Sequence, residues 1–380
     1  MSELRVIHVA ESLDPSGGGL PAVVTQLSEA QREAGISAKV VCVHGAPPSL
    51  PKCEQLPKPS LKEAIFSRGS FSIQLHKQMA EADILHLHGV WDVPLLVAAK
   101  LARRCGKPYL VTPHGMLDPW SMQQKAWKKK LGLKLGFRTM LDGAAAIHWL
   151  NDDEKRLAEP LRLRAKPMVI PNGLPRSALA GVPPAGSFRE RLKLGVPYIL
   201  FLSRLHKKKG LDILADAFAI VARESPVHLI VAGPDGGARA EFKARIHELE
   251  LDSRVSVIGP LYGAEKWEAL ADAACFCLPS RQEGFSMAIL EAMASRIPVV
   301  ISQECHFPEV AEAGAGYIEA LNAEAIAAGL RKVLSNRESA EAMGRAGREL
   351  VEQRYTWDRV AKQMIECYRN LRGAPRDAAP

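Results

Sequence analysis

The chain has 380 residues, 47% of them hydrophobic and 24% charged, a composition typical of globular proteins and not of disordered or fibrous ones. Its length suits two domains of ordinary size. The formal net charge of +8 favours an anionic partner such as nucleotide phosphates or a membrane, but no zinc-finger, RNA-recognition or basic-zipper pattern is present, so we expect no nucleic-acid partner.

The first residues, the lengths of the apolar runs and the cysteines of the sequence indicate a cellular compartment. The opening MSELRVIHVAES lacks a basic segment leading into an apolar run, and no stretch reaches the roughly 18 to 20 apolar residues of a membrane span. The seven cysteines lack zinc spacing, so we expect reduced thiols. The sequence therefore predicts a cytoplasmic protein.

Short runs rich in Val, Ile and Leu alternate with segments of helical period, a pattern of parallel strands joined by helices. The predicted strands of the first half are residues 4–9, 38–43, 83–88, 108–112, 145–150 and 167–170. After a Pro/Gly-rich passage, strands follow at 198–203, 228–233, 254–259, 275–280 and 297–302. We predict an α/β protein with two doubly wound domains, a linker at 176–189, and a final amphipathic helix at 356–373.

Glycines follow the first strand. Because ligands of open α/β sheets lie beyond the carboxyl ends of the strands, Gly17, Gly18 and Gly19 are candidates for close backbone approach to a phosphate. The stretch is not G-x-G-x-x-G, and no acidic residue closes the second strand. An NAD site is therefore weakly supported.

Histidines lie within or just after later strands of the first half. His114 comes just after strand 108–112, while His86 and His88 alternate and so share one face of their strand. A metal site that adds Asp118 is conceivable, but histidines at strand ends are more often hydrogen-bonding groups. We predict no metal.

The segment 118–141 mixes lysines with apolar residues that include Trp120 and Trp127. Such a mixture is typical of helices on anionic membrane surfaces. A core helix with a solvated lysine face fits equally well. The sequence leaves both interpretations open.

In the second half, SRLHKKKG follows strand 198–203 and contains Arg204 and Lys209. The planar fork of arginine and the point charge of lysine both suit a diphosphate. A solvated basic loop is the alternative.

The stretch CFCLPSRQEGFSMAILEAMA predicts a strand, a loop, and a helix that begins near Phe285 or Ser286. Backbone N–H groups of Gly284, Phe285 and Ser286 would then form an anion site at the start of the helix. Glu283 precedes the helix, and Glu291 lies within it.

Glu283 alone would be read as a partner of the helix dipole, and Glu291 as an exposed helical residue. The neighbours of Glu291, however, are the apolar residues Ile289, Leu290 and Met293. A buried carboxylate needs hydrogen-bond donors, and sugar hydroxyls can provide them.

Taken together, GGGLPAVV, TPHGM, PNGL, SRLHKKKG and EGFSMAILEA resemble the retaining glycosyltransferases of family four, or group one, of the type that builds bacterial cell-surface polysaccharides. The resemblance extends over most of the chain. It implies the GT-B fold, in which two Rossmann-like domains face each other across a cleft. The first domain would comprise residues 1–175 with helix 356–373 returning to it, and the second, donor-binding domain residues 190–355.

The same resemblance implies roles for the candidate residues. Arg204 and Lys209 would hold the diphosphate of a UDP- or GDP-sugar together with backbone groups at 17–19 and 284–286. Glu291 would bind the ribose, Glu283 the transferred sugar, and His114 would lie beside the reactive end of that sugar. Apart from the sugar nucleotide we expect no cofactor.

On the acceptor side we expect His88, Asp118 and Trp120, and a glycan acceptor that is lipid-linked and serves lipopolysaccharide, O-antigen or exopolysaccharide assembly. The enzyme would then lie on the inner face of the cell membrane. The chain departs from many relatives at His114-Gly115, where they have His-Asp, and at PNGLP, where they have PNGVD. A sugar-nucleotide epimerase and a two-lobed solute-binding protein are the alternatives.

Overall fold

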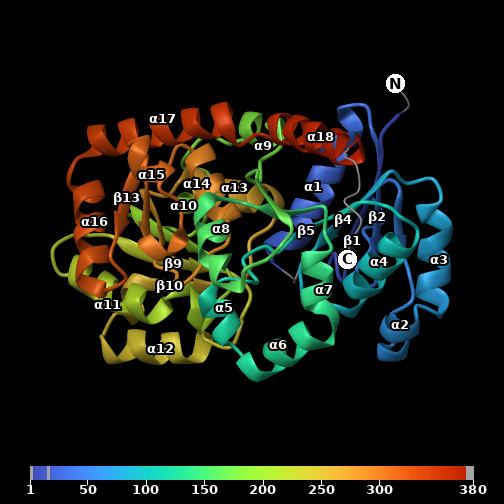
Figure 1. The fold of residues 1–380 in the computed structure, drawn as a ribbon. Coiled ribbons are helices and arrows are strands. Elements are labelled where there is room, and N and C mark those ends of the chain that lie inside the picture. Colours follow the sequence, from blue (N-terminus) through green and yellow to red (C-terminus); the bar gives the residue numbers. More distant parts are fainter. Residues whose placement is uncertain (1–2, 15–17, 374–380) are drawn as a thin grey trace. The chain divides into compact units, whose positions relative to one another are not determined.

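The computed structural model describes residues 3–14 and 18–373, which divide into two compact units (Figure 1). Unit 1 contains the chain up to Gly173 and resumes at Trp357, while unit 2 runs from Leu174 to Thr356. None of the helices in the described residues is long and apolar enough to cross a membrane.

Unit 1 is built on a seven-stranded parallel sheet with the order β3-β2-β1-β4-β5-β6-β7. The strands are β1 (Arg5–Ala10), β2 (Ser37–Cys42), β3 (Cys53–Gln55), β4 (Ile84–His88), β5 (Tyr109–Thr112), β6 (Ala146–Trp149) and β7 (Lys166–Val169). The strand order reverses between β1 and β4. In doubly wound sheets, the carboxyl ends of such a pair mark the ligand site.

The helices of unit 1 are α1 (Gly19–Glu33), α2 (Leu61–Phe66), α3 (Ser70–Met79), α4 (Val93–Arg104), α5 (Pro119–Gln123), α6 (Ala126–Gly132), the π-helical η2 (Leu133–Phe137), α7 (Arg138–Asp142), α8 (Asp152–Ala158), η3 (Glu159–Leu161) and α18 (Trp357–Gly373). The helix α18 packs against α1 (Figure 1) and is anchored there by the indole of Trp357, which donates to Gln26 over 2.7 Å. The last helix therefore returns to the first Rossmann-like unit, as expected.

The two faces of this sheet differ in polarity. Ile7 and Val9 of β1 and Leu85 and Leu87 of β4 belong to an apolar cluster with α3 and α4. Side chains alternate along a strand, so the intervening His8, His86 and His88 point to the opposite face. That face is covered by α1 and α18, and its buried imidazoles require hydrogen-bond partners.

Unit 2 has a six-stranded parallel sheet with the order β10-β9-β8-β11-β12-β13. Its strands are β8 (Tyr198–Leu202), β9 (His228–Ala232), β10 (Val255–Ile258), β11 (Cys275–Leu278), β12 (Val299–Ser302) and β13 (Gly316–Glu319). The strand order reverses between β8 and β11. Both strands are fully buried, which explains their almost uninterrupted apolar sequences.

The helices of unit 2 are α9 (Arg176–Ala180), α10 (Ser187–Arg191), η4 (Lys207–Lys209), α11 (Leu211–Ala222), α12 (Arg239–Glu248), η5 (Asp252–Arg254), α13 (Gly263–Ala271), α14 (Met287–Ala294), η6 (Gln303–Cys305), α15 (Glu309–Glu312), α16 (Ala323–Ser335) and α17 (Arg337–Arg354). The segment 176–189, for which the sequence predicts a linker, contains α9 and the start of α10. Its Leu179 and Phe188 are buried in the apolar core of unit 2.

Each of the eleven predicted strands is present, with ends shifted by at most a few residues, but the sequence did not reveal β3 and β13. Both are edge strands with weak patterns. The strand β3 has only three residues and reads Cys-Glu-Gln, while β13 begins with Gly316. A side chain at Gly316 would meet the carbonyl of Val299 on the neighbouring strand, so this glycine permits the pairing.

Candidate functional site

The predicted phosphate-binding residues of the second half lie at the carboxyl ends of β8 and β11, where the strand order reverses. Residues 203–210 follow β8, and residues 279–286 follow β11; we call these two segments the unit 2 rim. Arg204 lies in the first segment and is exposed. Among the described residues it forms no ion pair, so its guanidinium can receive an anion.

The two segments of the rim meet because Gly210 has no side chain. Gly210 adopts a left-handed conformation with φ of 69°, and a Cβ at this position would lie 1.9 Å from the carbonyl oxygen of Pro279. Only glycine satisfies both conditions. The close approach places the basic segment KKKG directly beside the loop that contains Glu283.

Lys209 and Glu283 form an ion pair at this contact. The distance between Nζ and Oε1 is 2.6 Å, and the two side chains are only 14% and 7% exposed. The hydroxyl of Ser280 donates to the same carboxylate oxygen. Two residues for which the sequence predicts a role are therefore brought into direct contact.

The carboxyl group of Glu283 is held in its ionised form. Burial opposes ionisation, but the charges of Lys209 and Lys208 and the hydrogen bonds from Lys209 and Ser280 outweigh it, so the pKa of Glu283 lies below its ordinary value. An ionised carboxylate only accepts hydrogen bonds. Glu283 is thus suited to bind hydroxyl groups or to face positive charge, and not to act as a general acid.

The sequence reasoning missed the residues that hold the rim in place. Arg281 binds Asp212 of α11 through two hydrogen bonds of 2.8 and 2.6 Å and also donates to the carbonyl of Lys207. Its own backbone N–H donates to the carbonyl of Lys208. Arg281 therefore fastens the loop after β11 to the basic segment after β8. No local pattern could reveal a pair so distant in sequence.

The helix after this loop begins close to the expected position. Ser286 is the N-cap of α14, whose first helical residue is Met287, and Gly284 and Phe285 lie in the preceding turn. The ring of Phe285 packs against Phe307 and Tyr355, which fixes the entry of the chain into the helix. The first turn of α14 thus points its N–H groups toward the rim, where an anion would be stabilised.

Glu291 lies on α14 and is only partly exposed, as its apolar neighbours suggested. Its Oε1 accepts a hydrogen bond of 2.6 Å from Nζ of Lys266 on α13, and the side chains are 15% and 24% exposed. Lys266 is thus a further residue that the sequence did not reveal. The ion pair holds one carboxylate oxygen in a fixed orientation.

In unit 1, two of the three predicted glycines are described. Gly17 lies outside the described residues. Gly18 has a φ of 88° and caps α1, of which Gly19 is the first residue, and no side chain within the described part of the chain caps this helix terminus. The loop after β1 therefore leads to a helix N-terminus, a position that suits a phosphate group.

The predicted His114 and His88 lie together in unit 1, with 3.2 Å between Nε2 of His114 and Nδ1 of His88. His114 is partly exposed and has a left-handed backbone with φ of 52°. The buried side chain of Asp118 caps α5 by accepting from the N–H of Trp120 over 2.8 Å. These two residues thus form the start of α5.

Glu154 of α8 was not predicted and fixes the loop after His114. Its two carboxylate oxygens accept from the N–H groups of Gly115 and Leu150 at 2.6 and 2.7 Å. Burial raises the pKa of Glu154 to about 7, against the opposing effect of these hydrogen bonds. The acidic first turn of α8 was visible in the sequence, but this contact was not.

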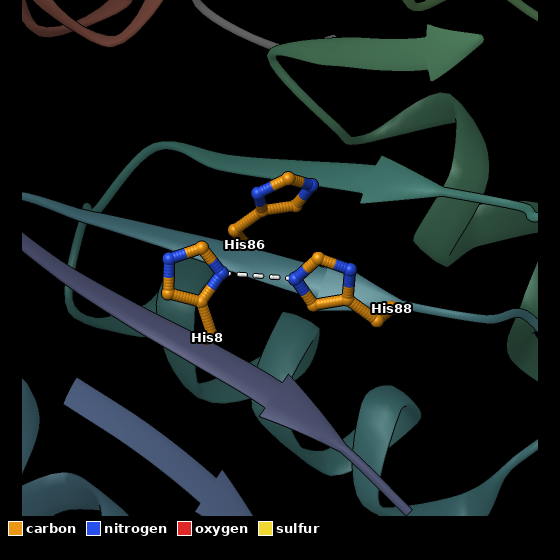
Figure 2. Close-up of side chains that lie close together, drawn as sticks. All are labelled: His8, His86 and His88. Carbon is orange, nitrogen blue, oxygen red and sulfur yellow. Dashed lines mark hydrogen bonds between the residues drawn. The ribbon is translucent and has the colours of Figure 1, made fainter. Parts of the chain in front are cut away.

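The sequence raised a metal site of His86, His88 and Asp118. In the structure, the histidines of β1 and β4 form a buried cluster that contains His8 in place of Asp118. Ligand atoms of His8, His86 and His88 lie within 4.8 Å of one another (Figure 2), and this is the group with metal-binding potential within residues 3–14 and 18–373. Their ring nitrogens, however, all have hydrogen-bond partners. A metal ion would have to displace several of these bonds, so the geometry favours a hydrogen-bonded cluster.

Comparisons with known proteins match both units. A family model described as "Glycosyl transferase 4-like domain" matches residues 18–173, and one described as "Glycosyl transferases group 1" matches residues 186–350. A GDP-mannose-dependent alpha-(1-6)-phosphatidylinositol monomannoside mannosyltransferase of Mycobacterium tuberculosis is 27% identical over 78% of this chain and 79% of its own length. The D-rhamnosyltransferase WbpZ of Pseudomonas aeruginosa is 27% identical over 79% of this chain and 78% of its own.

Two solved structures share the fold. Sucrose-phosphate synthase from Thermosynechococcus elongatus has a TM-score of 0.80 and 21% identity, with coverage of 97% of this chain and 99% of that protein. HepE from Anabaena, solved in complex with UDP-glucose, has a TM-score of 0.79 and 18% identity, with coverage of 97% and 100%.

Proposed function

The chain belongs to the group 1 glycosyltransferases of family four and has the GT-B fold, and we propose that it moves a hexose from a UDP- or GDP-sugar to a glycan with retention at the anomeric carbon. The observation that carries this proposal is the unit 2 rim. There, Arg204, which has no ion pair among the described residues, lies with the Lys209–Glu283 pair and the N-terminus of α14 at the reversal of the strand order.

In the proposed reaction Arg204 and Lys209 hold the donor diphosphate. The ammonium group of Lys209 has three N–H donors and uses one for Glu283, which leaves two for phosphate oxygens. As the bond between the anomeric carbon and the phosphate oxygen breaks, negative charge grows on the diphosphate. Fixed cations and the N–H groups at the start of α14 stabilise that change. With this positive charge in place, the proposed reaction requires no metal ion.

The carboxylates have separate roles in this proposal. Glu291, oriented by Lys266, accepts hydrogen bonds from the ribose hydroxyls. Glu283, ionised and oriented by Lys209, accepts from hydroxyls of the transferred sugar and faces the positive charge that develops at its anomeric carbon. The acceptor hydroxyl attacks on the side of the leaving diphosphate and gives its proton to a phosphate oxygen.

The remaining assignments lie in unit 1. His114 forms a hydrogen bond with the transferred sugar, and the glycine loop that ends at Gly18 and Gly19 contributes backbone N–H groups to the diphosphate. Asp118 and Trp120 belong to the acceptor side. His88, which the sequence also assigned to the acceptor side, is buried with both ring nitrogens bonded to His8 and His114, so it acts through His114. Support for a nucleotide-sugar donor comes from the relatives, one of which is named as GDP-mannose-dependent.

We propose that the acceptor is lipid-linked and serves cell-surface glycan assembly. A relative named as a phosphatidylinositol monomannoside mannosyltransferase supports this proposal. So does the surface of α6 and η2, where Trp127, Leu131 and Leu135 are 67%, 47% and 72% exposed. The exposed lysines around them are Lys125, Lys128, Lys130 and Lys134. Exposed apolar side chains among lysines fit an anionic membrane surface better than a core helix.

Liposome co-sedimentation tests the membrane contact. Lys128→Glu with Lys130→Glu should reduce binding to vesicles that contain anionic lipid. Lys129 is left unchanged because its Nζ already donates to Ser121. Lys193→Glu with Lys243→Glu, two exposed lysines of unit 2, makes the same charge change as a control. Equal binding by both double variants and the wild type would contradict the contact.

Product analysis tests the reaction. With a UDP- or GDP-sugar and a lipid-linked glycan acceptor, release of nucleoside diphosphate should rise with acceptor concentration. NMR should show the donor's anomeric configuration in the new linkage, and chelation of divalent metals should leave the rate unchanged. An altered sugar nucleotide formed without acceptor would instead indicate an epimerase, while an inverted linkage would overturn retention.

A further inference from the structure

The buried histidines of unit 1 belong to one continuous chain of hydrogen bonds. It runs through side chains of β1, β4, β5 and β6 and crosses to α1 and α18. The eight successive distances are 3.2 Å (His114 Nε2 to His88 Nδ1), 2.9 Å (His88 Nε2 to His8 Nδ1), 2.8 Å (His8 Nε2 to Gln31 Oε1), 3.1 Å (Gln31 Nε2 to Tyr368 hydroxyl), 2.7 Å (Tyr368 hydroxyl to His86 Nδ1), 2.6 Å (His86 Nε2 to Thr112 Oγ1), 2.8 Å (Thr112 Oγ1 to His148 Nδ1) and 2.7 Å (His148 Nε2 to the Ile170 carbonyl).

The five histidines in this chain of hydrogen bonds are all neutral at physiological pH, so the direction of each bond can be deduced. Burial lowers the pKa of His8 and His148 to about 4 and of His114 to about 3. Burial also lowers the pKa values of His86 and His88 well below the ordinary range. A neutral imidazole has one nitrogen that donates and one that accepts. Fixing one nitrogen of each ring therefore fixes the other.

The direction is set at the Ile170 end. A carbonyl oxygen only accepts, so Nε2 of His148 donates to it and Nδ1 accepts from the hydroxyl of Thr112. Thr112 has a single hydroxyl hydrogen, so its oxygen must accept from Nε2 of His86. Nδ1 of His86 then accepts from the hydroxyl of Tyr368.

The second half of the chain continues in the same direction. The oxygen of Tyr368 accepts from the amide nitrogen of Gln31, whose carbonyl oxygen accepts from Nε2 of His8. Nδ1 of His8 accepts from Nε2 of His88, the bond drawn in Figure 2. Nδ1 of His88 accepts from Nε2 of His114. Every link agrees in direction, and the last one leaves Nδ1 of His114 without a proton.

His114 is partly exposed, whereas the other side chains that form these hydrogen bonds are buried. Among the described residues Nδ1 of His114 has no hydrogen-bond partner. Its loop is held through Gly115 by Glu154. A fixed, unprotonated nitrogen at a partly exposed position can accept a hydrogen bond from a ligand.

We propose that this chain of hydrogen bonds, anchored at the Ile170 carbonyl, fixes the tautomer of His114 so that Nδ1 accepts a hydrogen bond from a hydroxyl of the bound sugar. The identity of the ligand rests on the proposed function, but the tautomer does not. Thr112, His148, His86, Tyr368, Gln31, His8 and His88 are positioning residues, since they act through His114 and do not touch the sugar.

The reversed chain would place a lone pair of His148 against the Ile170 carbonyl. A buried hydrogen bond would be lost there, which biases the equilibrium by roughly ten- to a hundred-fold toward the direction deduced here. Thr112→Val removes the link between this anchor and the rest of the chain. With the anchor disconnected, the six side chains from His86 to His114 can point their hydrogens either way, while His148 stays bonded to the Ile170 carbonyl. Thr112→Ser retains the hydroxyl and is the matched control.

The experiment uses the full chain labelled with 15N-histidine, free of ligand. Long-range proton–nitrogen NMR distinguishes protonated from unprotonated ring nitrogens, and His114→Gln identifies the signals of His114 among those of the 11 histidines. In the wild type and Thr112→Ser, the proton should reside on Nε2 of His114. In Thr112→Val, or in Tyr368→Phe if that variant folds better, both tautomers should appear.

A proton on Nδ1 of His114 in the wild type would overturn the inference without reference to any variant. A single Nε2 tautomer in folded Thr112→Val and Tyr368→Phe would also overturn it, because the distant anchor would then have no influence. In binding assays, the affinity of Thr112→Val for the donor should weaken by the factor by which the acceptor tautomer is depleted. Undiminished affinity despite depletion would overturn the role of Nδ1. A protein with the deduced tautomer that binds no nucleotide sugar would refute the proposed function and leave the chain of bonds in place.

Discussion

Lys209→Met separates the structural role of the Lys209–Glu283 pair from its proposed chemistry. Methionine keeps most of the side-chain volume and removes the charge, so the carboxylate of Glu283 stays buried without its main partner. Removing one member of a buried ion pair costs about 3–5 kcal/mol. Ser280 and Lys208 still interact with Glu283, so we expect a loss near the lower limit, about 3 kcal/mol.

The loss should depend on pH with a definite sign. In the wild type the pKa of Glu283 is lowered, so its contribution is present above the ordinary carboxyl pKa and disappears in acid. In Lys209→Met, burial acts without the lysine and raises this pKa, so the variant loses stability as pH rises through the new value. The difference in stability between the two proteins should therefore be larger at pH 8 than at pH 5.

Native-state hydrogen exchange of β8 and β11 measures this quantity within unit 2 and does not require the two units to unfold together. Lys243→Met removes an exposed lysine and should change the opening free energy by less than about 0.5 kcal/mol. Glu283→Gln in the Lys209→Met background should recover part of the loss, since no unpaired charge remains. A loss that is unaffected by Glu283→Gln would show that the lost stability does not come from an unpaired carboxylate at Glu283.

Other changes have equally specific outcomes. Glu291→Ala should abolish much of the thermal stabilisation by any UDP- or GDP-sugar, and a full shift in this variant would contradict the ribose role. Gly210→Ala should reduce stability by about 2 kcal/mol or more and weaken nucleotide binding, because the new Cβ overlaps a carbonyl and the left-handed backbone is strained; an unchanged melting temperature would show that the rim tolerates the methyl group. The pKa of His148 is about 4 in the folded protein, so its neutral ring contributes stability above pH 6.5 that is lost as pH falls through 4. The stability difference between the wild type and His148→Gln in urea titrations should thus shrink by up to about 3 kcal/mol over this range. The titration of Glu154 is common to both proteins and cancels in the difference. A constant difference would refute the lowered pKa of His148.

The sequence predicted the strands and the ends at which candidate residues lie, because buried parallel strands have near-continuous apolar runs and the residues just after them are polar. Arg204, Lys209 and Glu283 were found in this way. Their arrangement was not predicted. The contact between Lys209 and Glu283 depends on Gly210 packing against Pro279, and a glycine at the end of KKKG has many explanations until its neighbour is known.

The histidine chain shows the same limit. The alternation of His86 and His88 predicted that they share a face. The pairing register of β1 with β4, which sets His8 opposite His86, follows from the assembled sheet. Gln31 and Tyr368 join through helices more than 300 residues apart in sequence. Hydrogen-bonded networks between distant elements carry no local period and therefore escape pattern reasoning.

Isothermal titration calorimetry of the wild type and of Arg204→Ala with a panel of UDP- and GDP-sugars tests whether the unit 2 rim is a nucleotide-sugar site. We predict that one nucleotide sugar binds the wild type with one-to-one stoichiometry and that Arg204→Ala binds it at least tenfold more weakly, since a charge-assisted contact to the diphosphate is lost. Failure of every UDP- and GDP-sugar to bind the wild type, or equal affinity of the variant, would contradict a donor site at the unit 2 rim.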